Sequence, residues 1–237
     1  MKRAALPLSL LALVTLTACG GGDGDTSDKT AADKPKATAS QAKQVSPAER
    51  LAELMVTKAD VPGYNVEKLS AEYAFATSAD QVSTDKASCK PLALAMNQLP
   101  QDEPEADLSR YLSKSWSDPS TYITLAAYTT DTKAEAALTG LQKAVGACGA
   151  GFTAKAGKNT STYGSVTAEK AITNGALAFA STLTYQGITH TVHTEAVRDG
   201  DVLAVYFGVN GGAIAQGRPS DAKLSAAGLK AQNAKLG

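Results

Sequence analysis

The stretch ITHTVHTEAVRDGDVLAVYFGV, residues 188–209, decides the fold class of this chain. It contains two runs in which the side chains alternate in character, residues 188–198 and 202–209, with Asp199-Gly200 between them. An Asp-Gly pair between two alternating runs is a strong short-range sign of a β-hairpin. One face of the second run is apolar and comprises Leu203, Val205, Phe207 and Val209. The stretch therefore predicts two antiparallel strands whose side chains enter a core.

Further strand and helix patterns precede and follow this hairpin. The remaining runs of strand character are residues 108–117, 121–130, 160–172 and 176–185, and a less regular extended segment covers residues 64–76. The helical patterns cover residues 46–58, 90–98, 131–148 and, more weakly, 220–236. Hairpin connections with helices between them indicate an α+β domain. We expect an antiparallel β-sheet of about five to seven strands, with helices packed against it.

Two of the helices carry specific start signals. Ser46 is a good N-cap, Pro47 suits the first helical position, and Glu49 completes a capping box. The third helix is expected to begin with Asp131 or Thr132 as its cap. Its buried stripe is expected to comprise Ala134, Leu138, Leu141 and Val145.

The N-terminus has the pattern of an exported lipoprotein. A short basic segment, residues 1–3, precedes an apolar run at residues 6–17 that is too short to remain as a membrane span. Leu16-Thr17-Ala18-Cys19 resembles the lipobox of bacterial lipoprotein signal peptides. This resemblance implies cleavage before Cys19 and attachment of diacylglycerol, with fatty acids such as palmitate, to its sulfur. The alternative is an ordinary secretory signal that is cut near Ala18.

The residues after Cys19 have the composition of a flexible spacer. Residues 20–45 contain no aromatic residue and almost no large aliphatic one, so they cannot bury enough surface to fold. As a coil they would hold the following domain roughly 25 to 30 Å from the lipid on average. The predicted organisation is a lipoprotein signal peptide at 1–18, a lipidated cysteine and spacer at 19–45, and one extracellular α+β domain at 46–237. The chain would then lie on the outer face of the cell membrane, held there by its lipid anchor.

The charges of the chain are balanced. It has 23 basic and 23 acidic side chains, and loss of Lys2 and Arg3 with the signal peptide would leave 21 basic ones, a formal charge of −2. Such a balance provides neither the basic surface of a nucleic-acid-binding protein nor a polybasic patch for lipid headgroups. We therefore expect no nucleic-acid partner, and contact with the membrane only through the lipid anchor.

Cys89 and Cys148 remain as a pair if Cys19 carries the lipid. In an oxidising compartment such a pair is expected to form a disulfide, which would close a loop of about 60 residues and stabilise the fold by ~4 kcal/mol. The alternative is a reactive or metal-bound thiol pair. Both cysteines lie in alanine-rich, helix-like segments without a nearby histidine, which favours the disulfide.

The sequence contains no recognisable catalytic constellation. Gly-x-Ser-x-Gly is absent, and the glycines at 208–212 lack the spacing and the lysine of a phosphate-binding loop. The histidines, His190 and His193, lie on one predicted strand and point to opposite faces. His193 and Glu195 share a face and could join a weak metal site with a third ligand, but a solvated polar face is the preferred interpretation. We expect His190 to be partly buried and hydrogen bonded, and we expect no enzyme activity, catalytic residue, metal or cofactor.

Several tyrosines and the single tryptophan are candidates for a ligand groove, because their side chains combine an apolar body with a polar tip. The set comprises Tyr64, Tyr73, Tyr111, Trp116, Tyr122 and Tyr128. Trp116, beside a predicted turn, is the first choice, and the candidate groove consists of Trp116, Tyr111, Tyr122 and Tyr128. The edge of an ordinary core would use the same residue types.

The order of these motifs resembles the PknH-like family of extracellular sensor domains, which belong to actinobacterial receptor-type serine/threonine kinases and also occur on secreted lipoproteins. The resemblance extends over residues 51–210 and is carried by residues 51–61, Cys89-Lys90-Pro91-Leu92, the run from Tyr122 to Cys148-Gly149, and residues 198–203. The chain lacks the second disulfide of the kinase members, and Val145 stands where an aromatic residue often precedes the second cysteine. The resemblance implies an antiparallel sheet beside helices, with a cleft that receives a ligand.

The leading hypothesis is a membrane-anchored, non-catalytic binding module, similar to a sensor domain, that recognises a small or envelope-derived ligand or a protein partner. The first alternative is a structural or assembly-factor lipoprotein that works through a protein interface. The second is an envelope lipid carrier, which would need a large apolar cavity. Only 5% of the residues are aromatic, and the sequence shows no direct sign of such a cavity.

Overall fold

The computed structural model of the chain describes residues 45–71 and 74–237. The predictions for the signal peptide, for the lipid on Cys19 and for the spacer therefore lie outside the described residues, as does Tyr73. Within the described ranges the chain forms ten strands, five α-helices and two short 3₁₀ turns.

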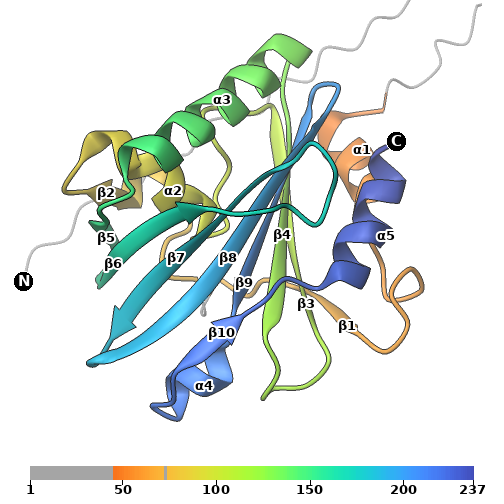
Figure 1. Cartoon of the computed structure of the whole chain (residues 1–237). Coiled ribbons are helices and arrows are strands. Elements are labelled where there is room, and N and C mark those ends of the chain that lie inside the picture. The colour runs from red at the N-terminus through yellow and green to blue at the C-terminus, as the bar shows by residue number, and fades with distance from the viewer. Residues whose placement is uncertain (1–44, 72–73) are drawn as a thin grey trace, which may run out of the picture. The chain divides into compact units, whose positions relative to one another are not determined.

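The ten strands of the described residues form one sheet (Figure 1). In chain order they are β1 (Asn65–Lys68), β2 (Val82–Thr84), β3 (Ala106–Ser113), β4 (Ser120–Ala127), β5 (Phe152–Ala156), β6 (Asn159–Ala168), β7 (Leu177–Tyr185), β8 (Ile188–Asp199), β9 (Val202–Val209) and β10 (Ser220–Ala222). Their order in the sheet is β1-β3-β4-β9-β8-β7-β6-β5-β2, with every neighbouring pair antiparallel. β10 lies off this path and pairs in parallel with β8. The predicted antiparallel sheet with helices is confirmed.

The expected number of five to seven strands is wrong. β2 and β10 have only three residues each, too few to show a periodic pattern in the sequence, whereas β1 lies within the extended segment that was expected at residues 64–76. The run expected at residues 160–172 belongs to a hairpin, in which Phe152 of β5 pairs with Tyr163 of β6. Such strands form because a neighbouring strand supplies backbone partners, and no local pattern reports that neighbour.

The hairpin of β8 and β9 is confirmed, and it lies in the middle of the sheet. Asp199 pairs with Val202, so the two turn residues are Gly200 and Asp201. Gly200 has a φ of +53°, in the left-handed region that glycine adopts without steric penalty. Asp201 also connects this turn to the first helix, because its carboxylate accepts two hydrogen bonds from the guanidinium of Arg50, at 2.9 and 2.6 Å.

Five α-helices of the described residues accompany the sheet. They are α1 (Pro47–Leu54), α2 (Lys90–Ala95), α3 (Asp131–Ala147), α4 (Gly211–Ala215) and α5 (Ala226–Leu236), and the 3₁₀ turns are Ala79–Gln81 and Ala87–Cys89. Among the helices in these ranges, none is both long and apolar enough to cross a membrane.

Side-chain caps precede the first turns of α1 and α3. The capping box of α1 is confirmed, since the Glu49 amide donates to Ser46 Oγ while the Ser46 amide donates to Glu49 Oε2. The N-cap of α3 is Thr130, one residue before the first predicted candidate, and its hydroxyl accepts from the Lys133 amide. The first two helices end earlier than expected, at Leu54 and Ala95.

Each face of the sheet has its own hydrophobic core. α2 and α3 cover one face, which we call the α2/α3 face, and α1 and α5 cover the other (Figure 1). Strand β9 contributes to both cores: Leu203, Val205 and Phe207 enter the first, and Val202, Ala204 and Tyr206 enter the second. The stripe of α3 that meets the sheet consists of Ala134, Ala137, Leu141, Ala144 and Val145, while the predicted Leu138 is only partly buried.

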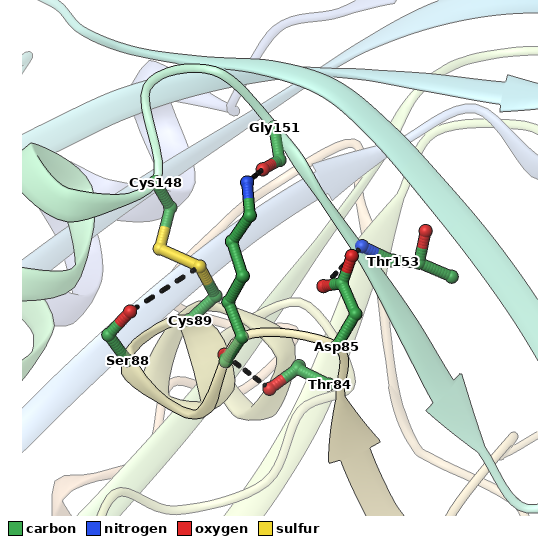
Figure 2. Close-up of a disulfide and its surroundings, with 8 residues drawn as sticks. Thr84, Asp85, Ser88, Cys89, Cys148, Gly151 and Thr153 are labelled. Atoms are coloured by element: carbon green, nitrogen blue, oxygen red, sulfur yellow. Dashed lines mark hydrogen bonds between the residues drawn. A yellow bond between two sulfur atoms is a disulfide. The ribbon is translucent and has the colours of Figure 1, made fainter.

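The predicted disulfide is present and connects Cys89 to Cys148, with a Cα–Cα distance of 5.9 Å (Figure 2). It joins the turn before α2 to the residue that follows α3, so both helices of the α2/α3 face are held at one end. Next to it, Lys86 Nζ donates to the carbonyl oxygen of Gly151 at 2.6 Å, and the Thr153 amide donates to Asp85 Oδ1 at 2.9 Å. These contacts tie the same turn to the start of β5.

Candidate functional site

A groove of about 510 Å³ lies on the α2/α3 face of the sheet. Residues of β4, β6, β7 and β9 line it, together with α4 and with the segment 96–98 that follows α2. Five of the lining side chains are aromatic: Phe75, Tyr122, Tyr163, Tyr185 and Phe207. We call this concavity the aromatic groove.

Strand register brings the aromatic side chains together. Tyr122 of β4 pairs directly with Phe207 of β9, so both side chains leave the sheet on the same face, and their ring centroids are 6.2 Å apart. Phe207 is part of the α2/α3 core, and Tyr122 packs against that core from outside. The groove is therefore the continuation of the core beyond the helices, where the sheet still presents large apolar side chains.

Among the described residues, those that line the groove carry no charge. The groove's polar side chains are amides, such as those of Asn97 and Gln186, the phenols of the tyrosines, and the hydroxyl of Ser161. Burial raises the pKa of Tyr163 to about 12 and raises the pKa of Tyr122 above its ordinary value. Both phenols therefore stay protonated across the physiological pH range and act as neutral hydrogen-bonding groups.

The structure separates the four predicted groove residues. Tyr122 lines the aromatic groove, and Tyr111 stands beside it on β3, with ring centroids 5.8 Å apart. The Tyr111 hydroxyl donates to Glu67 Oε2. Tyr128 is buried and donates to the carbonyl oxygen of Gln101, and Trp116 is 68% exposed in the connection between β3 and β4.

The other aromatic residues of the groove are not among the predicted groove residues. Phe207 belongs to the apolar face predicted for residues 202–209, and Tyr185 is the last residue of a predicted strand, so the sequence pattern places both in the sheet. The pattern does not predict which part of that face the helices leave uncovered.

A second cavity, of about 640 Å³, lies between α2 and α3 near their N-terminal ends. Tyr128 lines it, together with four charged residues, Lys90, Asp102, Glu103 and Lys133. These two positive and two negative side chains make the cavity strongly polar, and a ligand there would have to replace their contacts with water. The aromatic groove is the better candidate site, because ligand sites are predominantly apolar with few polar groups.

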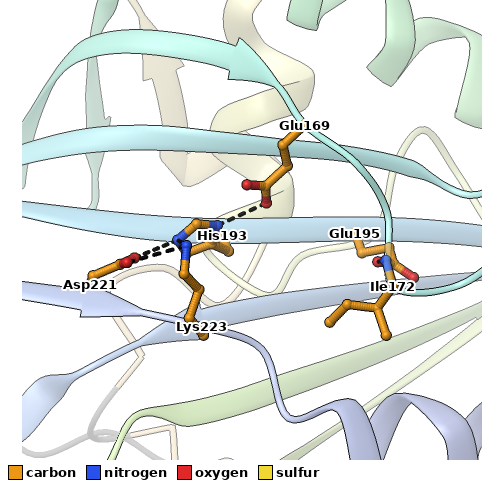
Figure 3. A network of polar contacts seen from close by, with 6 residues as sticks. All are labelled: Glu169, Ile172, His193, Glu195, Asp221 and Lys223. Carbon is orange, nitrogen blue, oxygen red and sulfur yellow. Dashed lines mark hydrogen bonds and ion pairs between the residues drawn. The ribbon is translucent and has the colours of Figure 1, made fainter.

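His193 and Glu195 share a face of β8 as predicted (Figure 3), but the face is not solvated. The two side chains are only 4% and 1% exposed. Glu195 accepts hydrogen bonds from the backbone amides of Ile172 and Thr173, at 2.7 and 2.9 Å. The preferred interpretation of a solvated polar face is therefore wrong, because the segment that follows β6 folds over these residues.

The imidazole of His193 lies between two carboxylates. Its Nδ1 is 2.8 Å from Glu169 Oε1, and its Nε2 is 2.6 Å from Asp221 Oδ1. Lys223 Nζ also approaches Nε2, at 3.1 Å. The two carboxylates are on opposite edges of the ring, so they do not converge on one ion, and the described residues contain no group of three such side chains suited to a metal. This network connects β8 with β10 and with the end of β6.

His190 points to the opposite face, as its position along β8 predicts. Its side chain is 1% exposed, and Nδ1 lies 3.0 Å from Ser220 Oγ of β10. The expected hydrogen bond is present, and the burial is deeper than expected. Burial lowers the pKa of His190 below its ordinary value.

The fold is similar to that of a protein of known structure. No protein-family model matches the chain, and no curated protein matches it. The crystal structure of the extracellular domain of PknH from Mycobacterium tuberculosis is similar, with a TM-score of 0.50 and 12% sequence identity, over 81% of this chain and 95% of that one. The two proteins therefore share a fold, which is the fold that the sequence resemblance implied.

Proposed function

We propose that this chain is a membrane-anchored extracytoplasmic lipoprotein whose domain is a non-catalytic, sensor-like module that binds a ligand in the aromatic groove. The observation that carries the proposal is the groove itself. It is preformed, about 510 Å³ in volume, and lined mainly by aromatic and aliphatic side chains with a few neutral polar groups. Small-molecule sites have this size and composition.

Two features support an extracytoplasmic location. The disulfide between Cys89 and Cys148 is of the kind that persists in oxidising compartments. The protein with the similar fold is described as an extracellular domain. The anchor itself rests on the sequence around Cys19, which resembles a lipobox.

The experiment that tests ligand binding is native mass spectrometry of residues 46–237, exported by the organism's own cells and purified from its envelope without detergent. This segment contains both hydrophobic cores, the whole sheet and the disulfide, so it has its own core and folds as a unit. A discrete added mass is expected on the wild-type domain.

Two matched tyrosine variants locate that ligand. Tyr122→Ala removes a ring from the groove, whereas Tyr64→Ala removes a ring that packs against the core of the opposite face. We expect the added mass to be lost from the first variant and kept by the second. A mass that Tyr122→Ala retains would place the ligand elsewhere, and a bare wild-type domain would favour the assembly-factor alternative.

A further inference from the structure

The lining of the aromatic groove differs from the rest of the chain in its charge. Fifteen described residues line it, and none is Asp, Glu, Lys, Arg or His. At the chain's overall share of 19% charged residues, about three of the fifteen would be charged. The second cavity, by contrast, has four charged residues among ten. The groove therefore offers no counter-ion among the described residues that line it.

The environment of the groove would penalise a charged ligand. Burial raises the pKa of Tyr163 and of Tyr122, because an ionised phenol would lose its contact with water at these positions. An ion that entered would lose its water without gaining an opposite charge, and such a transfer is strongly unfavourable. The groove selects against ionised groups at its floor.

The side chains of the groove favour a hydrocarbon body. Leu183, Phe207 and Ile214 present apolar surface from three different elements. At the rim, Phe75 and Tyr185 are 59% and 45% exposed, and they are two of the few large hydrophobic side chains that the described part of the chain leaves exposed. Apolar surface that gathers around a concavity marks a binding site rather than scattered exposure.

Neutral hydrogen-bonding groups complete the groove. Asn97 and Gln98 donate to the backbone carbonyls of Ala93 and Met96, so the side-chain amide oxygens of these two residues and of Gln186 are the groups that can accept from a hydroxyl or amide of a ligand without any charge. We infer that the aromatic groove takes the hydrocarbon body of an uncharged molecule, a chain or fused rings, whose polar end is neutral. This inference rests on the proposed function, because it names the class of ligand for the same site.

Displacement of a neutral fluorescent probe tests the ligand class on the domain of residues 46–237. N-phenyl-1-naphthylamine is uncharged, and its fluorescence rises in apolar sites. We expect one probe to bind per domain, and we expect 1-decanol to displace it at a concentration at least about tenfold lower than decanoate does at neutral pH, because the two competitors differ mainly in charge. Decanoate that competes as well as decanol, or better, would overturn the inference.

A pair of isoleucine variants assigns the probe to the groove. Ile214→Asp places a carboxylate on the wall formed by α4, and Ile172→Asp places one on an exposed side chain, 52% accessible, next to Glu195 on the other face of β8. We expect the first variant to weaken probe binding at least about tenfold and the second to leave it unchanged. Ala215→Asp, an exposed position on the same wall, serves if Ile214→Asp disturbs α4.

The outcomes separate this inference from the proposed function. A neutral probe that fails to bind, or that binds Ile214→Asp and Ala215→Asp as tightly as it binds the wild-type domain, overturns the inference about ligand class. If the native ligand is still lost from Tyr122→Ala in that case, the groove remains the site of a binding module, and its ligand is of another class. If no variant of the groove affects any ligand, both ideas fail together.

Discussion

Glu195 shows how a single buried side chain organises its surroundings. Glu195 is 1% exposed, and its carboxylate accepts hydrogen bonds from the amides of Ile172 (Figure 3) and Thr173, which lie in the connection between β6 and β7. One carboxylate that accepts hydrogen bonds from two backbone amides fixes the position of both. Glu195 therefore holds this connection over the sheet.

Glu195→Ala is expected to lower the free energy of unfolding by about 2 kcal/mol, because the amides of Ile172 and Thr173 lose their acceptor. Glu195→Gln keeps one carbonyl oxygen and should lose less. Urea denaturation of the purified domain measures both values. Glu135→Ala, on the exposed side of α3, is the control and should change the free energy by less than about 0.5 kcal/mol. A Glu195→Ala domain as stable as this control would contradict the role of the carboxylate.

His190 makes the stability of the domain depend on pH. Burial lowers its pKa in the folded state, so below about pH 6.5 the unfolded chain binds this proton more readily than the folded one. The stabilisation is complete above that pH and decreases as the pH falls below it. One proton can account for at most about 1.4 kcal/mol per pH unit.

We therefore expect the free energy of unfolding to decrease between pH 7.5 and pH 5.5, and we expect His190→Gln to decrease less over the same interval. Urea titrations at both pH values provide the measurement. If the variant and the wild-type domain have equal pH slopes, His190 is not the group responsible.

At the scale of elements, the disulfide joins the turn before α2 to the end of α3. The two cysteines are 59 residues apart in the sequence, and both are fully buried. A cross-link over such a loop restricts the unfolded chain and stabilises the fold by ~4 kcal/mol in the chain-entropy model. The segment 96–98 that follows α2 lines the aromatic groove, so the bridge also restrains the helix that precedes this part of the groove.

Replacement of Cys89 and Cys148 by alanine should therefore lower the free energy of unfolding by ~4 kcal/mol, as measured by urea denaturation. In the wild-type domain the intact mass should increase on treatment with an alkylating agent only after reduction and unfolding. Alkylation of either cysteine without reductant would show that the bridge does not form.

The short strand β10 depends on one glycine. A Cβ atom at position 208 would lie 2.5 Å from the carbonyl oxygen of Ala222, so β10 passes directly over Gly208 of β9. Only a residue without a side chain permits this approach. Once in place, β10 pairs with β8 and supplies Ser220 to His190 and Asp221 to His193.

At the scale of the whole molecule, the proposed function depends on the anchor at Cys19. Cys19→Ala should abolish labelling by a radioactive or clickable fatty acid and leave the precursor uncleaved, because the modified cysteine is the proposed cleavage site. Labelling and membrane fractionation of cells that express the full chain provide the test, with Cys89→Ala as the matched cysteine control. Normal lipid labelling of the Cys19 variant would falsify the lipoprotein assignment.

Local signals in the sequence were sufficient for much of the fold. The Asp199-Gly200 pair with its flanking alternation predicted the central hairpin, and Ser46 with Glu49 predicted the start of α1. Such signals depend on residues a few positions apart, so they can be read without knowledge of the tertiary structure. The pairing of Cys89 with Cys148 also followed, because they are the cysteines that remain once Cys19 is set aside.

The tertiary structure alone decided where the candidate site lies. Alternation showed that Phe207 faces a core, but only the positions of α2, α3 and α4 determine that this core continues into an open groove lined by Tyr122 and Tyr163. The same holds for Glu195, whose environment is set by residues that fold over it from the β6–β7 connection. Burial of a side chain depends on which distant segment covers it, and that choice is made by the packing of the whole chain rather than by the neighbours of the residue in sequence.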